Sequence, residues 1–420
     1  MTRLTERWRI LLHAPNFKTR LFLAGTLLVL VTTAIWVFPL PSTKTLDHDA
    51  YIWQRSWNAA LETAIESNSD LVSTWRVLAA QARPDGRLVA TAISKAVLQR
   101  NQRPVVLVIR IDGQLQKFDS ARLQGDVLAL YRRWVAEGLP VAGIEIDFDC
   151  ATSRLPEYSR FLDGLRSTLD SKAKLSITAL PAWLASPALG ELLSHPDESV
   201  LQVHSVEHPG SGGLLDPGKA RQWIVRYAEI TPRVFRVALP TYGSRIGFDD
   251  YGNLAFVESE TALGRGSTTS HELTVQPQAV KDLLDHMKRS APKKLLGFSW
   301  FRLPTNSDKR AWSAATWRAL VLDQPLTRQP RIEARGTPDP RLFDLVLSNP
   351  GLTDVPLPSR IPLPTTCTDA DGANEYEATT NDGGLVLARA HSSLLHPDSE
   401  LPLGWARCAH NPTEELHGQT

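Results

Sequence analysis

The sequence predicts an α/β fold of the (β/α)8 TIM-barrel type, with a C-terminal β-sandwich-like domain and an N-terminal transmembrane helix. Three observations support this prediction. Between residues 46 and 324, short β-rich runs alternate with amphipathic stretches of helical period, over a length typical of such a barrel. Residues 325–420 contain β-like runs punctuated by proline. Before the barrel, an uncharged segment follows a basic one.

The N-terminal region divides into a basic cytoplasmic tail at 1–20 and an uncharged segment at 21–40. Twenty such residues are enough to cross a bilayer as a helix, and the basic flank stays in the cytoplasm. A cleaved signal segment is the alternative, but Val37-Phe38-Pro39 lacks the small residues of a cleavage site. We expect a single-pass inner-membrane protein with a periplasmic globular part, or a secreted protein if the segment is cleaved.

Eight strands are expected within the barrel region, at 50–53, 71–76, 105–110, 143–149, 175–180, 200–204, 234–239 and 295–300. Helical patterns lie between many of them, at 126–137, 156–169, 217–228, 276–289 and 309–322. A doubly wound open sheet is the alternative, although no glycine-rich phosphate loop follows the first strand. An extra hairpin is expected at 84–93. A long loop at 243–272 is expected at the C-terminal face, where the binding loops of barrels gather.

Composition and the absence of certain motifs argue against several classes of function. The 46 Lys and Arg residues balance 45 Asp and Glu, so no nucleic-acid partner is expected. Motifs typical of serine hydrolases, zinc peptidases and NTPases do not occur, and we expect no cofactor. Cys367 and Cys408 are expected to pair in an oxidising compartment, leaving Cys150 as an inert thiol; three reduced thiols are the alternative.

The most informative strand is the fourth, where Glu145, Asp147 and Asp149 alternate with apolar residues and therefore share one face. A strand covered on both sides directs that face into the barrel or a cleft, where an unpaired carboxylate is costly. Clustered carboxylates raise one another's pKa, which allows one of them to serve as a general acid. Asp149, nearest the open end, is the candidate acid. Asp147 is expected to tune Asp149 or to orient a substrate acetamido group.

Further residues near strand ends are expected to bind substrate together with Glu145, namely Arg76, Asp112, His204, Glu207, Tyr242, Trp300 and Arg302. Arg76 is suited to hold a carboxylate or a uronate, and Asp112 to bind hydroxyl groups. The structural alternative is that Arg76, Arg110 or Arg302 neutralises the acidic strand, with no reaction. His204 and His208 do not lie on one helix face, so no metal site is expected.

The acidic strand also resembles the fourth-strand signature of the family 18 chitinase-like glycosidases. This resemblance implies that Asp149 occupies the position of the proton-donating glutamate and that Asp147 keeps its place. It also implies that Trp300 matches the tryptophan that floors the sugar subsite. The chain departs from the family at Ala142 and Glu145, which replace two aspartates, and Asp149 is one methylene shorter than the family's acid.

A broader resemblance, over residues 51 to about 301, is to a bacterial family of unknown function numbered 3142, in phrases such as Ile146-Asp147-Phe148-Asp149-Cys150-Ala151-Thr152. It implies a glycosidase-like barrel and supplies no activity. The sequence thus predicts a glycoside hydrolase-like protein that acts on an extracytoplasmic polysaccharide or glycan. The alternative is a non-catalytic glycan-binding or envelope-complex scaffold protein. An aspartate at the proton-donor position favours the scaffold, whereas a second carboxylate from Asp112 or Glu207 favours the enzyme.

Overall fold

The structure is a computed structural model, and it describes residues 45–420 apart from 114, 116–117, 205–212, 252, 259–268, 309, 327–329, 382, 391 and 418–420. By their contacts, residues 45–420 form one compact unit. The predicted transmembrane segment at 21–40 lies outside the described residues and stays a prediction. Within the described part of the chain, no helix combines the length and the apolar character needed to span a bilayer.

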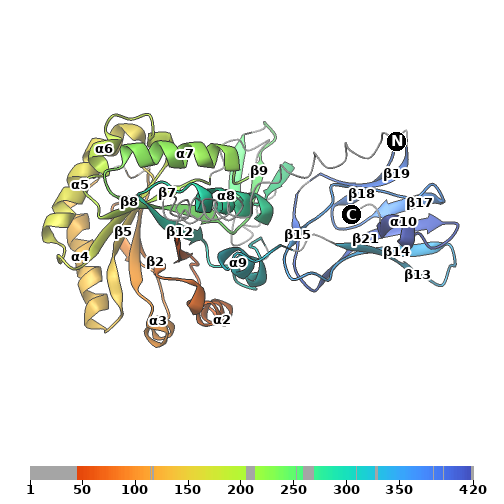
Figure 1. The fold of residues 1–420 in the computed structure, drawn as a ribbon, viewed down its shortest axis with the longest axis horizontal. Helices are drawn as coiled ribbons and strands as arrows, with labels where there is room; N and C mark the ends of the chain where they lie inside the picture. Colours follow the sequence, from red (N-terminus) through yellow and green to blue (C-terminus); the bar gives the residue numbers. More distant parts are fainter. Residues whose placement is uncertain are drawn as a thin grey trace, which may run out of the picture. The chain divides into compact units, whose positions relative to one another are not determined.

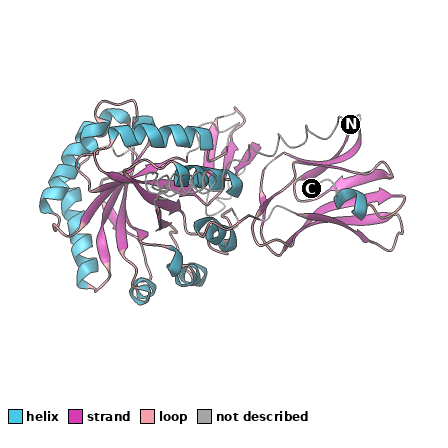
Figure 2. Ribbon diagram, in the orientation of Figure 1, coloured by secondary structure: helices cyan, strands magenta, loops and turns pink. Residues whose placement is uncertain are grey.

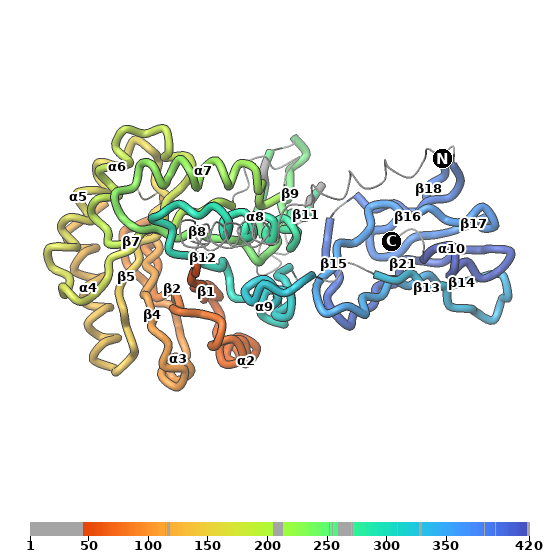
Figure 3. Tube along the Cα trace, in the orientation of Figure 1, coloured from red at the N-terminus to blue at the C-terminus, as the bar shows by residue number. Residues whose placement is uncertain are grey.

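A closed barrel of eight parallel strands forms the first part of this unit (Figures 1 and 3). Its strands are β1 (Asp47–Ile52), β2 (Trp75–Ala82), β4 (Val105–Ile111), β5 (Val141–Phe148), β6 (Lys174–Ala179), β7 (Glu198–Gln202), β8 (Val234–Pro240) and β12 (Leu295–Phe301). Strand β1 pairs in parallel with both β12 and β2, which closes the ring. The predicted TIM-type barrel is therefore confirmed, and the open doubly wound sheet is excluded.

Helices surround the barrel, as Figure 2 shows in cyan. They are α2 (Ala59–Ser67), α3 (Lys95–Asn101), α4 (Ser120–Ala136), α5 (Leu155–Thr168), α6 (Leu189–Leu192), α7 (Pro217–Ile230), α8 (Pro277–Arg289) and α9 (Ala314–Val321), with 3-10 turns at Ser69–Leu71, Thr152–Arg154 and Pro181–Trp183. Their apolar faces share one core cluster with the outward faces of the strands. Capping residues determine where several helices begin. The side chain of Asp119, for example, caps α4 by accepting a hydrogen bond from the Arg122 amide at 3.1 Å.

Two excursions interrupt the β/α alternation. The hairpin predicted at 84–93 is present, because β3 (Leu88–Ala90) pairs antiparallel with β2. The segment predicted as a long loop at 243–272 instead contains a small antiparallel sheet. There β9 (Ser244–Phe248) lies between β10 (Leu254–Glu258) and β11 (Thr269–Leu273). This sheet follows β8 and so belongs to the C-terminal side of the barrel.

The C-terminal region is β-rich, as predicted. One sheet contains β13 (Arg331–Gly336), β14 (Leu342–Asn349), β21 (Ser399–Cys408) and β17 (Cys367–Gly372); another contains β16 (Arg360–Pro362), β19 (Gly384–Arg389) and β18 (Tyr376–Asn381). The short strands β15 (Val355–Pro356) and β20 (Leu394–Leu395) pair with each other, and α10 (Thr413–His417) follows β21. Leu345 and Leu387, one from each larger sheet, belong to a single apolar cluster, so the two sheets share one core.

The cysteines follow the sequence prediction. Cys367 and Cys408 are joined at an S–S distance of 2.09 Å, and the bridge links β17 to the end of β21. Cys150 is buried and free, and burial raises the pKa of its thiol to about 11. A thiol that stays protonated at neutral pH is a poor nucleophile, so Cys150 is a packing residue.

Candidate functional site

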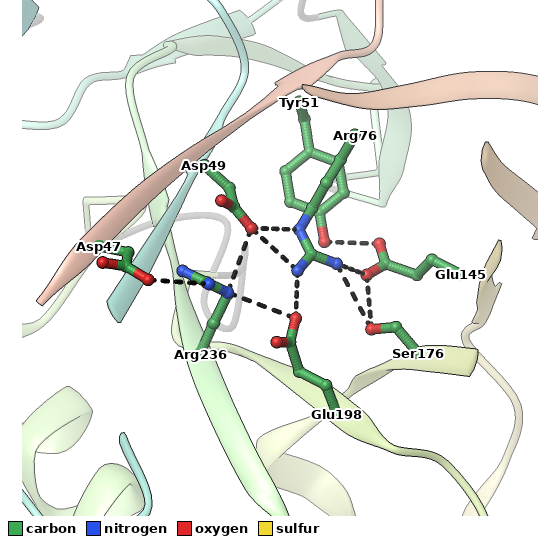
Figure 4. Close-up of polar contacts among 8 residues, drawn as sticks. All are labelled: Asp47, Asp49, Tyr51, Arg76, Glu145, Ser176, Glu198 and Arg236. Atoms are coloured by element: carbon green, nitrogen blue, oxygen red, sulfur yellow. Dashed lines mark hydrogen bonds and ion pairs between the residues drawn. The ribbon is translucent and has the colours of Figure 1, made fainter. Parts of the chain in front are cut away.

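A buried ionic layer fills the barrel interior toward the N-terminal ends of the strands (Figure 4). Arg76 of β2 contacts the carboxylates of Asp49, Glu145 and Glu198, which come from β1, β5 and β7. Arg236 of β8 contacts Asp49 Oδ2 at 3.1 Å and Glu198 Oε1 at 3.3 Å. Each of the five side chains is at most 8% exposed. The layer therefore joins five strands through shared guanidinium groups.

The pKa values of this layer reflect burial and guanidinium pairing. Burial raises the pKa of Glu145, with Arg76 opposing it. For Glu198, burial acts to raise the pKa, but Arg76 and Arg236 outweigh it and lower the pKa. These groups are an ion-paired structural network, which is the alternative that the sequence left open for the acidic strand. The prediction that Glu145 and Arg76 bind substrate is therefore corrected, because both lie beneath the cavity and contact other protein groups.

Tyr51 separates this layer from the space above it. Its hydroxyl donates to Glu145 Oε1 at 2.7 Å, and its ring packs with Val108, Val200 and Ala238 in an apolar cluster. The opposite side of Tyr51 lines a cavity. A tyrosine suits this position because its ring fills the barrel while its hydroxyl satisfies a buried carboxylate.

The cavity has a volume of about 470 Å³ and lies at the C-terminal ends of the strands, where barrel chemistry takes place. Its polar lining includes Arg55, Arg110, Asp147, Asp149, Thr178 and Gln202. Its aromatic lining includes Tyr51, Trp53, His204, Tyr242 and Phe301. The acidic strand thus contributes one carboxylate to the ionic layer and two to the cavity, and the expectation of a hollow beside the acids is correct for Asp147 and Asp149 only.

The two cavity aspartates share one guanidinium. Arg110 donates from Nη1 to Asp147 Oδ2 at 2.5 Å and from Nη2 to Asp149 Oδ2 at 2.9 Å. Thr178 Oγ1 donates to Asp147 Oδ1 at 2.7 Å, so both oxygens of this buried carboxylate are engaged. The side chain of Asp149 is 29% exposed. Its Oδ1 atom is buried and has no hydrogen-bond partner among the described residues.

Asp149 has the electrostatics of a proton donor. Burial raises its pKa to about 6, the charge of Asp147 adds to the rise, and Arg110 acts against it. A carboxyl group with this pKa is half protonated near pH 6, so it donates or accepts a proton under mild conditions. Asp149 is therefore a cavity carboxyl group that changes its protonation near pH 6, and its role as a general acid stays a prediction.

The aromatic wall is centred on Phe301, the last residue of β12. The Phe301 ring centroid lies 5.0 Å from that of Trp53, 5.5 Å from those of Tyr51 and His204, and 5.6 Å from that of Tyr242. Phe301 and Trp53 are only half-buried, so parts of both rings remain accessible in the cavity. An apolar ring beside hydrogen-bonding groups suits a sugar, which has both kinds of surface.

Trp300 does not belong to this wall, and the prediction that it floors a sugar subsite is corrected. It is fully buried, its Nε1 atom donates to His48 Nδ1 at 3.1 Å, and its ring packs against Trp312 and Trp317 on the helix side of the barrel. Successive side chains of a strand point to opposite faces. Trp300 therefore points outward, and Phe301 points into the cavity.

The other predicted residues have different places. His204 lines the cavity, and burial lowers its pKa to about 4, so the ring is neutral at pH 7. Its Nδ1 atom lies 3.3 Å from the carbonyl of Ala238 and donates to it, leaving Nε2 as an acceptor. Tyr242 also lines the cavity, and burial raises its pKa to about 12. Arg302 is buried and pairs with Asp308, so it supports the site from outside the lining.

Two predicted acids do not join the site as described. Asp112 is half-buried and is not part of the cavity lining, although its charge contributes to the raised pKa of Asp149. Glu207 lies outside the described residues. Among the described residues, no group of three or more His, Cys, Asp or Glu side chains is arranged to hold a metal ion.

The fold and the site define a TIM-type barrel with an acidic, aromatic-lined cavity at the C-terminal ends of its strands. Residues 101–306 match a family model described as a domain of unknown function (DUF3142), which confirms the resemblance noted in the sequence. Residues 332–409 match a second domain of unknown function (DUF8456), within the β-rich region. No curated protein matches the chain significantly.

The solved structures that are similar to this chain include two bacterial enzymes. The spore cortex-lytic enzyme SleL of Bacillus cereus is 17% identical, and the similarity covers 69% of this chain and 76% of that one at a TM-score of 0.47. A chitinase of Chromobacterium violaceum is 15% identical, with 67% of this chain and 100% of that one covered at a TM-score of 0.49.

Proposed function

We propose that the protein is a glycoside hydrolase-like enzyme that acts on an extracytoplasmic polysaccharide or glycan, with Asp149 as the general acid. The observation that carries this proposal is the state of Asp149 in the cavity. Its Oδ1 atom is buried without a hydrogen-bond partner among the described residues, and its pKa is raised to about 6. A carboxyl group of raised pKa beside a sugar-sized cavity supplies the general acid, one of the two groups that glycosidic bond cleavage ordinarily uses.

In the proposed reaction, protonated Asp149 donates its proton to the glycosidic oxygen as the bond to the leaving sugar breaks. Asp147 acts through Asp149, because both Asp147 oxygens are engaged by Arg110 and Thr178. Its fixed negative charge favours the protonated form of Asp149. Asp147 is therefore a positioning residue rather than a second substrate-contacting acid.

The remaining lining groups are suited to binding. Phe301 and Trp53 offer apolar ring surface to the C–H face of a sugar, and His204 and Tyr242 offer one acceptor and one hydroxyl for its hydroxyl groups. Asp147 and Asp149 are the only carboxylates in the described part of the lining. The proposal therefore assigns the proton donor and leaves the activation of water unassigned.

The extracytoplasmic setting is part of the proposal. The Cys367–Cys408 bridge supports it, because structural disulfides persist in oxidising compartments. The basic tail at 1–20 and the uncharged segment at 21–40 support anchoring in the inner membrane. Protease treatment of intact spheroplasts tests the orientation: a periplasmic globular part is digested, whereas a protected one contradicts the proposal.

The test of catalysis is Asp149→Asn. Release of reducing ends is measured over a panel of envelope and extracellular polysaccharides with wild type, with Asp149→Asn and with Asp126→Asn, a control on the outer face of α4. Loss of a general acid lowers the rate by about 10²-fold or more. Only the Asp149 variant should lose activity, and circular dichroism should show both variants folded. Retained activity in Asp149→Asn would overturn the assignment.

A second function, non-catalytic glycan binding, is favoured by one observation. Arg110 pairs with both cavity aspartates, as expected for acids that are held ionised for structural reasons. This alternative predicts that wild type binds members of the panel and releases nothing from any of them. It also predicts that Asp149→Asn binds as well as wild type.

A further inference from the structure

Among the residues that the structure describes, the cavity lining contains one cation without a partner. Arg55 lines the cavity and is exposed, and it makes no ion pair or hydrogen bond with any described residue. The other lining cation, Arg110, directs Nη1 to Asp147 and Nη2 to Asp149. Among the described lining residues, Arg55 is therefore the guanidinium available to a ligand.

We propose that the cavity takes a sugar that bears a carboxylate, a uronic acid residue of an acidic polysaccharide, and that Arg55 binds this carboxylate. The inference rests on the proposed function and names its substrate class. A guanidinium presents paired N–H groups that match the two oxygens of a carboxylate. The interaction also gives a negative charge to Arg55, which has no counter-ion within the described part of the chain.

The rest of the lining fits a monoanion with hydroxyl groups. The side chains of Gln202 and Tyr242 make no hydrogen bond to any described residue, and neutral His204 offers an acceptor. A dianionic phosphate fits less well, because Asp147 and Asp149 lie in the same cavity and repel it. A carboxylate requires only the single charge that Arg55 supplies.

This assignment replaces the role that the sequence gave to Arg76. Arg76 is 2% exposed and already contacts three carboxylates below Tyr51. A substrate carboxylate at that depth would meet Asp49, Glu145 and Glu198 before it met the guanidinium. Arg55 follows β1 in the chain and lines the cavity, and no carboxylate of a described residue pairs with its guanidinium.

Isothermal titration calorimetry with matched ligand pairs tests the proposal. The probes are trigalacturonate and a hyaluronan tetrasaccharide, each beside its methyl ester, which removes the charge and keeps the ring. Cellotriose and chitotriose serve as neutral references. Titrations are made at pH 8, where Asp149 is ionised and cannot donate a proton, with wild type, Arg55→Gln, Arg55→Lys and Arg132→Gln. Arg132 is exposed on α4 and makes no ion pair with a described residue, so its variant is the matched control.

We expect wild type and Arg132→Gln to bind at least one acid about tenfold or more tighter than its ester, the range of a charge-assisted hydrogen bond. Arg55→Gln should lose this preference, and Arg55→Lys should keep part of it. Equal binding of acid and ester by wild type, or a preference that survives Arg55→Gln, overturns the inference. If neutral oligosaccharides bind while the acids show no preference, the inference alone fails. If no oligosaccharide binds, the proposed glycan function fails with it.

Discussion

The raised pKa of Asp149 predicts how the stability of the barrel changes with pH. The ordinary pKa of an aspartate is 3.8, and the pKa of Asp149 in the folded protein is about 6. At about 1.4 kcal/mol per pKa unit, the difference corresponds to about 3 kcal/mol. The folded state binds the proton more tightly than the unfolded state, so this group lowers the free energy of unfolding as pH rises from about 4 to about 7.

Asp149→Asn removes this contribution. Asparagine keeps an oxygen that accepts from Arg110 but carries no charge, so the variant should lack that part of the pH dependence. The free energy of unfolding of the variant minus that of wild type should therefore be about 2–3 kcal/mol larger at pH 7.5 than at pH 4. Any pH-independent loss of hydrogen bonding cancels in this comparison.

Urea unfolding followed by tryptophan fluorescence at pH 4, 5, 6 and 7.5 measures the difference. The signal reports mainly on the barrel, where Trp75, Trp183 and Trp300 are buried. Asp126→Asn on α4 controls for the change of side chain. If the difference between Asp149→Asn and wild type is the same at all four pH values, the reasoning from burial and the Asp147 charge is refuted.

Three further perturbations test the architecture. Arg76→Met leaves three buried carboxylates short of a counter-ion and should lower the free energy of unfolding by about 3–5 kcal/mol in urea titrations; a loss below about 1 kcal/mol would contradict the shared pairing. Trp300→Ala should lower the free energy of unfolding by about 3–5 kcal/mol. Phe301→Ala should weaken oligosaccharide binding and lower the free energy of unfolding by less. If Trp300→Ala instead weakens binding and Phe301→Ala mainly lowers stability, Trp300 and not Phe301 contacts the sugar. Cys367→Ser opens a loop of 41 residues and should destabilise the β-rich region by about 4 kcal/mol, seen as faster hydrogen exchange in β17 and β21. Reducing agent should have the same effect on wild type and none on the variant.

Much of the barrel could be predicted because strand and helix periods are local properties of the chain. The acidic strand alternates strictly, and its three carboxylates do share the inward face. Elements with weaker patterns were missed: α2 and α3 are short, with nine and seven residues. The sequence predicts a loop at 243–272 because the segment is rich in Gly and Ser, whereas the structure has a sheet at 244–273. Gly247 is required there by tertiary packing, since a Cβ at this position would lie 2.2 Å from the Phe256 ring.

The sequence predicted which strand face carries the acidic side chains, but not how far along the barrel axis each of them lies. Alternation places Glu145, Asp147 and Asp149 on one face, yet only the three-dimensional structure shows that Glu145 contacts Arg76 in the ionic layer. For a similar reason, the sequence of the last barrel strand predicted that Trp300 lies in the cavity, where the structure has Phe301. Its run Leu-Leu-Gly-Phe-Ser-Trp-Phe is apolar on both faces, so no period shows which side is inward. The contacts of Trp300 on the helix side and the place of Phe301 in the cavity lining show the orientation, and Gly297 has the same parity as Phe301.

The shared guanidinium layer has a consequence for how the chain reaches its native state. Arg76 near the beginning of the barrel is neutralised by residues of β1, β5 and β7, and Arg236 near its end returns to β1 and β7. A fragment with only the first half would leave Arg76 without Glu198, and a fragment with only the second half would leave Arg236 without Asp49. The network is complete only when the ring closes, and we expect each half, expressed separately, to be much less stable than the closed barrel and to gain stability when the halves associate.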